Sequence, residues 1–409
     1  MIKIVSQTTR KKMIKKKLKQ FIVTVALLLG LTPAMSAESL KIGMTGVLTG
    51  PAAALGNDMR SGIESYFQLV NKQGGIQGRQ LELIVYDDGY EPERAAYNMR
   101  KLIDEDKVLA VIGNIGTPTA IVTAPIAQEK KTLLFGAFSG GGVLRPYPPS
   151  RYIINYRPSY AEETEEMING LIQLGTQPEE IAFFTQRDGY GNAAYQGAIN
   201  ALERHGFKNG SSLAHGRYTR NTLNVEDAVA VLLDSPVTPK AVIMAGGYAP
   251  SAKFIKLLQQ ELPELVFLNV SFVGSHSLQK ELPKEISNVI VTQAVPDIDS
   301  NLAIIADYRT ALEEFNAQLE VNTVSLEGFI IAKIFHQALL KIKGDITNEN
   351  IIDAIESLGS LDIGLGLDIY FDKSDHQAIH TVWMTCIDSG RLKAFTWDML
   401  FTKKMVSKD

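Results

Sequence analysis

The chain has 409 residues, of which 45% are hydrophobic and 21% are charged, and its formal net charge at pH 7 is −4. This composition is that of an ordinary soluble globular protein, and the length exceeds what one compact core usually holds, so two domains are expected. An acidic chain offers no basic surface, which argues against nucleic acid or anionic lipid as a partner.

The first 37 residues differ in composition from the rest of the chain. They hold eight Lys or Arg and no acid, and the apolar run Phe21–Leu31 is followed by small residues up to Ala37. This order is typical of a cleaved signal peptide, which we assign to residues 1–37 with cleavage near Ser36 or Ala37. The alternative is a permanent N-terminal anchor helix, and translation could start at Met1 or at Met13. Without this segment the net charge falls from −4 to about −12.

The number and position of cysteines indicate the cellular compartment and whether the protein carries a lipid anchor. Cys386 is the only cysteine, so the chain forms no internal disulfide and has no lipid-attachment cysteine near the cleavage site. An exported, soluble, cysteine-poor protein fits the periplasm of a Gram-negative cell, which is the predicted location.

From Leu40 onward, short β-like runs alternate with amphipathic helical runs, and the alternation restarts near Ala161. This order predicts an α/β fold with two doubly wound, parallel-sheet lobes that face each other across a cleft. Short crossings are expected near Tyr152–Arg157, near Val289–Val295 and near the C-terminus. The predicted helices cover residues 59–72, 92–105, 119–128, 161–174, 192–205, 225–233 and 251–260.

Ligands of open parallel sheets bind beyond the carboxyl ends of the strands, next to helix N-termini. Glycines, hydroxyls and tyrosines gather at these places in the sequence, so we look for the site there. The segments are 48–55, 113–119, 136–142, 186–191, 246–250 and 271–275.

Catalytic and metal sites are the weaker interpretations of these segments. Ser139 lies in Ala-Phe-Ser-Gly-Gly, one residue short of the hydrolase nucleophile elbow, and no downstream histidine lies in a recognisable partner motif. Neither glycine-rich phosphate motif is present. His376 and His380 have zinc-ligand spacing but lack the accompanying glutamate. The adjacent Asp87 and Asp88 point to opposite faces of a strand, so a turn role is expected.

A carboxylate clamp uses the residues that are present. Thr117 opens a predicted helix after a buried strand, where free backbone N–H groups and the helix dipole favour an anion. Ser139 and the amide of Gly140 offer the same chemistry from the next strand end, so the two make a clamp without a cation. Tyr190 and Tyr248, at strand ends of the second half, would face this clamp from the opposite wall. Plain helix capping and a tight turn remain the alternative for Thr117 and Ser139.

Several segments together resemble a known family. They are LTGPAAALGNDMRSGIESYFQLVNKQGG, VIGNIGTPTA, FGAFSGGGVLR, QRDGYGNAA, AGGYAPSAKFI, FLNVSFVGS and VSLEGFIIAK. They are similar to leucine/isoleucine/valine-binding proteins, the type I periplasmic solute-binding proteins of ABC transporters. The resemblance implies lobe 1 at 38–156 and 294–378, lobe 2 at 157–293 and 379–409, and three hinge crossings between them.

The resemblance also implies a function. The expected protein is a monomeric, non-catalytic binder without cofactor or metal, which captures a small carboxylate-bearing ligand and delivers it to an inner-membrane ABC permease. A neutral or branched-chain amino acid is the leading ligand, and an amide or an aromatic acid is the alternative. A sensor that reports to a membrane receptor would use the same binding chemistry, and neighbouring genes would distinguish it.

The family's binding positions carry over with two departures. Thr117, Phe138, Ser139, Gly140, Tyr190 and Tyr248 fall on matching positions. Leu55 replaces a first-lobe aromatic residue, and Ser271 replaces the glutamate that binds the ligand ammonium group. Losing that carboxylate removes a charge-assisted hydrogen bond. Glu327 can substitute for it if its helix opens into the cleft, and a solvent-facing Glu327 is the alternative. Phe329 is expected to line the pocket.

Overall fold

The computed structural model describes residues 12–13, 15–16 and 38–400. Most of the predicted signal peptide lies outside the described residues. Met1–Glu38 and Ser39–Asp409 form two separate units, and the fold below is that of the second.

The first sheet is built from the N-terminal part of this unit. Its strands are β1 (Leu40–Gly46), β2 (Leu81–Asp87), β3 (Ala110–Ile112), β4 (Leu133–Phe135) and β5 (Ile153–Ile154). All are parallel and lie in the order β2-β1-β3-β4-β5. The crossovers carry α2 (Ala53–Lys72), α3 (Pro92–Asp104) and α4 (Thr117–Lys130). Strands β3 to β5 are buried apolar runs, as expected where helices cover both faces of a parallel sheet.

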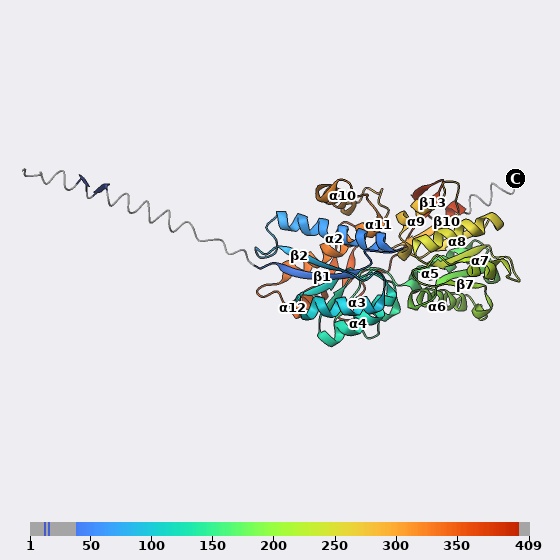
Figure 1. Ribbon diagram of the computed structural model, residues 1–409, viewed down its shortest axis with the longest axis horizontal. Helices are drawn as coiled ribbons and strands as arrows, with labels where there is room; N and C mark the ends of the chain where they lie inside the picture. Colours follow the sequence, from blue (N-terminus) through green and yellow to red (C-terminus); the bar gives the residue numbers. More distant parts are fainter. Residues whose placement is uncertain (1–11, 14, 17–37, 401–409) are drawn as a thin grey trace, which may run out of the picture. The chain divides into compact units, whose positions relative to one another are not determined.

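The second sheet repeats the same topology. Its parallel strands are β6 (Ile181–Gln186), β7 (His215–Tyr218), β8 (Ala241–Ala245), β9 (Val266–Asn269) and β10 (Val289–Gln293), in the order β10-β9-β8-β6-β7. Helices α5 (Tyr160–Gln173), α6 (Gly189–Arg204), α7 (Glu226–Leu233), α8 (Tyr248–Glu261) and α9 (Ser275–Glu281) accompany them. Figure 1 shows α5 to α9 around this sheet and α2 to α4 around the first. The prediction of two doubly wound parallel-sheet lobes is confirmed.

Two strands of the second sheet were not predicted. Strands β13 (Trp383–Asp388) and β14 (Arg391–Ala394) extend it antiparallel beyond β10. Most of their residues are partly buried or exposed, because they form an edge that is covered less completely than the central strands.

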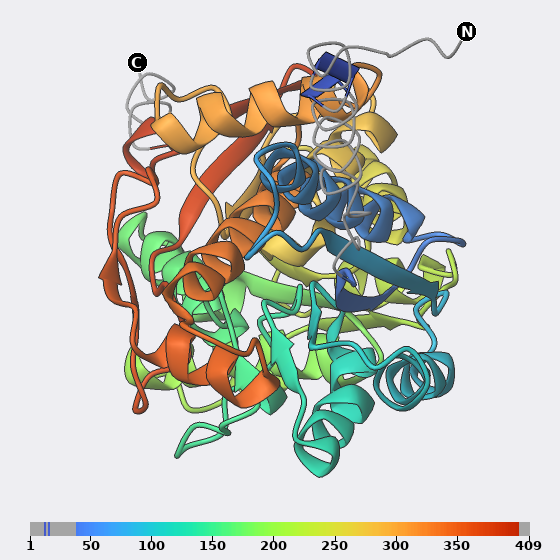
Figure 2. The same cartoon turned by 90° about the vertical axis from the view of Figure 1, so that its left-hand side faces the viewer.

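The chain returns to the first sheet after β10. Helices α10 (Ala303–Asn316), α11 (Thr323–Lys341) and α12 (Asn348–Glu356) are followed by the small hairpin of β11 (Gly359–Leu361) and β12 (Ile369–Phe371). Both ribbon views place these orange segments beside the blue and cyan elements of the first sheet (Figures 1 and 2). Helix α11 is long and apolar enough to cross a membrane, but 78% of its apolar window is buried in protein, as in a core helix.

Two of the connecting segments run side by side. The amide of Asn155 donates to the carbonyl of His376 at 2.7 Å, and the amide of Ala378 donates back to Asn155 at 3.0 Å. Arg145 fixes this junction, because its Nη2 donates to the carbonyl of Arg157 at 2.7 Å and its Nε to Gln377 Oε1 at 2.6 Å. The crossing beside β5 is therefore tied to the crossing beside β13.

His380 lies at this junction between carboxylates from both lobes. Its Nδ1 bonds Glu162, near the start of α5, and its Nε2 lies 3.3 Å from Asp375 Oδ2. The hydrogen bond to Glu162 raises the pKa of His380 to about 9, and Asp375 contributes. His376, four residues earlier, instead bonds the carbonyls of Ser150 and Ile153.

We expect this cluster to make stability depend on pH between about 6.5 and 9. Because the pKa of this histidine is higher in the folded than in the unfolded protein, its stabilisation is complete below the pKa of the unfolded state. The stabilisation is lost as the pH rises through the pKa of the folded state. Because the imidazole is more than half exposed, the loss should be about 1 kcal/mol or less. Urea unfolding at pH 6.5 and at pH 9 should show that the free energy of unfolding falls less in His380→Asn than in the wild type. The control His205→Asn, at a histidine bonded to Asn169, should lose as much stability between the two pH values as the wild type. If His380→Asn also loses as much as the wild type, His380 is not the group responsible.

Candidate functional site

A buried pair of hydroxyls lies where β3 and β4 end. Thr117 is the first residue of α4 and Ser139 follows β4, and their Oγ atoms are 2.7 Å apart. The Ser139 hydroxyl also accepts the amide of Gly141 at 3.1 Å. Thr117 does not cap the helix, since Gly116 holds that position and no side chain caps it. The pair thus presents hydroxyls at the positive end of a helix, which favours an anionic group.

Gly140 brings the second lobe against this pair. Its carbonyl accepts the amide of Tyr160, the first residue of α5, at 2.9 Å. A Cβ on Gly140 would lie 2.6 Å from the Tyr160 ring, so only glycine permits this approach. Burial raises the pKa of Tyr160 to about 12, and its hydroxyl has no well-aligned hydrogen-bond partner among the described residues. Tyr160 therefore brings a neutral hydroxyl to the clamp from the second lobe.

Aromatic rings from both lobes meet beside the clamp. Phe272 lies 5.4 Å from Phe138 and 4.7 Å from Tyr190 between ring centroids. Tyr160 lies 5.2 Å from Tyr190, and Tyr90 lies 5.9 Å from Phe272. Phe138 and Tyr190, both expected at the site, thus lie in one aromatic wall with Phe272, Tyr160 and Tyr90, which sequence reasoning missed.

A buried cation stands in this wall, so the prediction of a clamp without a cation does not describe the site. Arg157 is 1% exposed, and its guanidinium lies over the Phe138 ring at 4.1 Å. Its Nη2 donates to Ser271 Oγ at 2.9 Å and to Glu327 Oε2 at 3.2 Å. The only sequence indication was a charged residue within the apolar crossing YIINYRP.

Ser271 is bonded to a carboxylate that the sequence did not connect with it. Its amide and its hydroxyl donate to Glu163, on α5, at 2.7 and 2.9 Å. The Thr292 hydroxyl donates to the same carboxylate. A charged group therefore stands beside position 271 although the residue there is serine, and it comes from α5, more than a hundred residues earlier.

Glu327 reaches the site from α11. It is 2% exposed, and its Oε1 lies 3.2 Å from the Arg157 Nε. Burial raises the pKa of Glu327, and the charge of Arg157 opposes that rise. The structure thus makes Glu327 the counter-charge of Arg157.

Three expected site residues lie away from the hydroxyl pair. Phe329 is buried in the helical core, 5.0 Å from the Tyr66 ring and 5.7 Å from Tyr308. Leu55 is buried in α2, where a Cβ on Gly274 would lie 2.7 Å from it. Tyr248 begins α8 and lines a pocket of about 440 Å³ with Asp58 and His276. Leu55 and Tyr248 therefore belong to another part of the cleft than Thr117 and Ser139.

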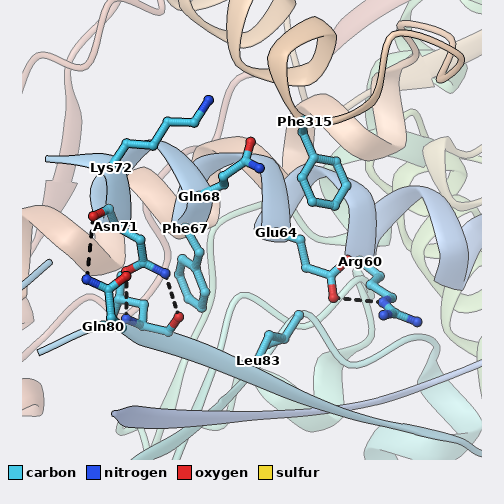
Figure 3. Close-up of a pocket in the computed structure, with 10 residues that line it drawn as sticks. Arg60, Glu64, Phe67, Gln68, Asn71, Lys72, Gln80, Leu83 and Phe315 are labelled. Carbon is cyan, nitrogen blue, oxygen red and sulfur yellow. Dashed lines mark hydrogen bonds and ion pairs between the residues drawn. The ribbon is translucent and has the colours of Figure 1, made fainter. Parts of the chain in front are cut away.

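A separate hollow of about 670 Å³ lies on the outside of the first lobe (Figure 3). It is formed by α2, β2 and Phe315 of α10, and Arg60 and Glu64 form an ion pair of 2.9 Å in it. None of the expected site residues lines it. Its position on one lobe distinguishes it from the site between the lobes.

An ion-pair cluster joins the lobes beside the aromatic wall, where the Arg220 guanidinium lies 5.8 Å from the centre of the Tyr90 ring. Arg220, after β7, binds Glu91, before α3, at 2.8 Å, and Asn221 Nδ2 donates to the same carboxylate at 2.7 Å. Asn221 Nδ2 also donates to the carbonyl of Gly89 at 3.1 Å. These contacts exist only while the lobes are together, so they favour closure without contacting a ligand at the clamp.

We expect Arg220→Ala to weaken ligand binding up to about fivefold, because partly exposed ion pairs contribute about 1 kcal/mol or less. Equilibrium titration of a bound ligand checks this. Arg100→Ala removes an exposed pair with Glu129 inside the first lobe and should leave affinity unchanged. Equal affinity in wild type and Arg220→Ala would show that the contact does not contribute to closure.

The fold defines a class: an α/β protein of two lobes with the same topology, whose polar and aromatic side chains meet between the lobes. Residues 39–391 match the periplasmic binding protein family, and the chain belongs to this family. The sequence-based recognition of the family is confirmed.

Relatives come from several bacteria. The crystal structure of a possible leucine/isoleucine/valine-binding protein from Rhodopirellula baltica SH 1 is 45% identical, covers 90% of this chain and 99% of that one, and superposes with a TM-score of 0.87. Leu/Ile/Val-binding protein homolog 7 of Brucella suis is 23% identical over 346 residues, 78% of this chain and 81% of that protein. A leucine-, isoleucine-, valine-, threonine- and alanine-binding protein of Pseudomonas aeruginosa is 32% identical over 101 residues, 25% of this chain and only 27% of that protein.

Proposed function

We propose that this protein is the periplasmic solute-binding component of an ABC-type uptake system. It captures a small carboxylate-bearing solute between its lobes and delivers it to an inner-membrane permease. The signal peptide at residues 1–37 would direct its export. The names of its relatives make leucine, isoleucine and valine the first solutes to test.

The buried pair of Thr117 and Ser139 is the observation that carries this proposal. Two hydroxyls 2.7 Å apart, at the N-terminal end of α4 and, through Ser139, next in the chain to Phe138, on which Arg157 packs, form a site for a carboxylate. The bonds of Ser139 also favour binding over hydrolysis, because its hydroxyl contacts Thr117 and Gly141 rather than a histidine. We therefore expect affinity without turnover.

A thermal-shift screen tests the proposal. The panel contains neutral amino acids, their keto acids, aromatic acids and the corresponding amides. A ligand at a hundred times its Kd adds about 2.7 kcal/mol of stability, which should raise Tm by several degrees. A shift with one group of carboxylates, and none with matching amides, supports the proposal. Shifts only with uncharged solutes would contradict it.

A further inference from the structure

Arg157 has a donor that the protein does not use. Its Nη2 is bonded to Ser271 and Glu327, whereas its Nη1 is buried and has no hydrogen-bond partner in the described part of the chain. A buried guanidinium N–H without an acceptor is costly. Because Arg157 is 1% exposed and lies against Phe138, this donor is directed into the wall of the proposed site.

The carboxylates around Arg157 are already engaged. Glu163 accepts three donors, from the amide and hydroxyl of Ser271 and from Thr292. Glu327 lies against the guanidinium through both of its oxygens, at 3.2 Å. Glu327 Oε1 accepts no aligned hydrogen bond among the described residues, but a ligand ammonium group there would have to compete with the guanidinium 3.2 Å away, whereas Arg157 Nη1 offers a ligand carboxylate an N–H that no acceptor contacts.

The remaining surroundings are apolar. The guanidinium covers one face of Phe138, and Phe272 and Tyr190 pack beside it. These rings suit a ligand body that is aliphatic or aromatic. Tyr160 adds a neutral hydroxyl near Thr117 that has no well-aligned partner among the described residues, and this hydroxyl can donate to a second carboxylate oxygen.

We propose that Arg157 is the specificity-determining residue of the site, that it binds the ligand carboxylate, and that the ligand is a monocarboxylic acid with an apolar body and no required α-ammonium group. This inference rests on the proposed function and narrows its ligand class. It assigns Glu327 to holding Arg157 in place, and it makes a keto, hydroxy or aromatic acid a better ligand than the matching amino acid.

Matched ligand pairs test the inference. Calorimetric titrations compare leucine with 4-methyl-2-oxopentanoate and phenylalanine with phenylpyruvate. The acid of at least one pair is expected to bind tenfold or more tightly than its amino acid. Tighter binding of both amino acids would overturn the inference and leave the proposed function standing. If none of the acids, the amino acids and the other carboxylates of the panel binds, the proposed function is overturned as well.

Two substitutions separate the roles of the buried charges. Arg157→Lys, which keeps the charge but loses the planar fork, should weaken acid binding tenfold to a hundredfold. Glu327→Gln removes the competing negative charge but keeps an amide oxygen that can accept from Arg157, so it should weaken acid binding less than Arg157→Lys does. If Glu327 instead holds a ligand ammonium group, Glu327→Gln will weaken amino-acid binding tenfold or more, which would overturn the assignment.

Folding is controlled separately, because either substitution disturbs a buried ion pair. The double variant Arg157→Gln/Glu327→Gln removes both charges of this pair, while Glu163 keeps its hydrogen bonds from Ser271 and Thr292. Thermal unfolding without ligand verifies that it folds. A folded double variant is expected to lose acid binding at least tenfold; unchanged acid binding would show that Arg157 does not contact the ligand.

Discussion

Replacing Gly62 with alanine is expected to destabilise the protein by about 3 kcal/mol. Alanine would ordinarily stabilise the interior of a helix relative to glycine, by about 1 kcal/mol. Here a Cβ would lie 1.9 Å from the carbonyl oxygen of Ser325, where α2 packs against α11. Overlap with a backbone atom has no flexible side chain to relieve it, so the steric cost exceeds the gain in helix propensity.

The same contact positions the site. Gly328, which follows Glu327, has Met59 of α2 facing it, and a Cβ there would lie 2.4 Å from the Met59 carbonyl oxygen. Two glycines thus let α11 approach α2 closely enough to hold Glu327 at Arg157. Urea unfolding measures the effect of Gly62→Ala. Gly142→Ala, where nothing lies within 4 Å of the added atom, should change stability by about 0.5 kcal/mol or less. Equal stability of Gly62→Ala and the wild type would contradict the close helix contact.

Removing both hydroxyls of the clamp is expected to weaken ligand binding about a hundredfold. The double variant Thr117→Val/Ser139→Ala keeps the side-chain shapes nearly unchanged but leaves a ligand carboxylate without the hydroxyl donor that the mutually bonded pair offers. Hydrogen bonds to charged groups contribute about 1.5–3 kcal/mol each. Removing the pair together avoids leaving one hydroxyl without its 2.7 Å partner, so folding should be retained.

Thr123→Val is the matched control for the clamp. Thr123 lies on the same helix, is fully buried, and its hydroxyl has no hydrogen-bond partner within the described residues. We expect its replacement to leave affinity unchanged and stability equal or higher. One ligand is titrated into the wild type, Thr123→Val and the double variant. Similar losses of affinity in the two variants would mean that the clamp hydroxyls act only through folding.

The order of helices and strands was predictable, because the spacing of hydrophobic residues and the glycines at turns are local properties of a sequence. Helix starts were less so: α4 begins at Thr117 and α8 at Tyr248, two and three residues before the predicted starts. Pro118 and Pro250 lie in the first turns of these helices, where proline is tolerated, and the prediction began each helix beyond its proline. The antiparallel β13 and β14 fell in a segment read only as a crossing.

The site was predictable only where it follows strand ends. Thr117 and Ser139 meet because parallel strands end at one edge of a sheet. Arg157, Glu163 and Glu327 come together from a crossing, a helix and a distant helix, and no local pattern relates them. Ser271 shows the consequence, because the sequence indicates a lost carboxylate whereas the fold supplies Glu163 beside it.

One measurement tests the central claim most directly. Isothermal titration of the purified protein with the carboxylate that gives the largest thermal shift should show one ligand bound per chain, with a negative heat-capacity change from burial between the lobes. The same titration of Thr117→Val/Ser139→Ala should show binding about a hundredfold weaker. Saturable binding of equal strength in the double variant would place the ligand elsewhere and contradict the account.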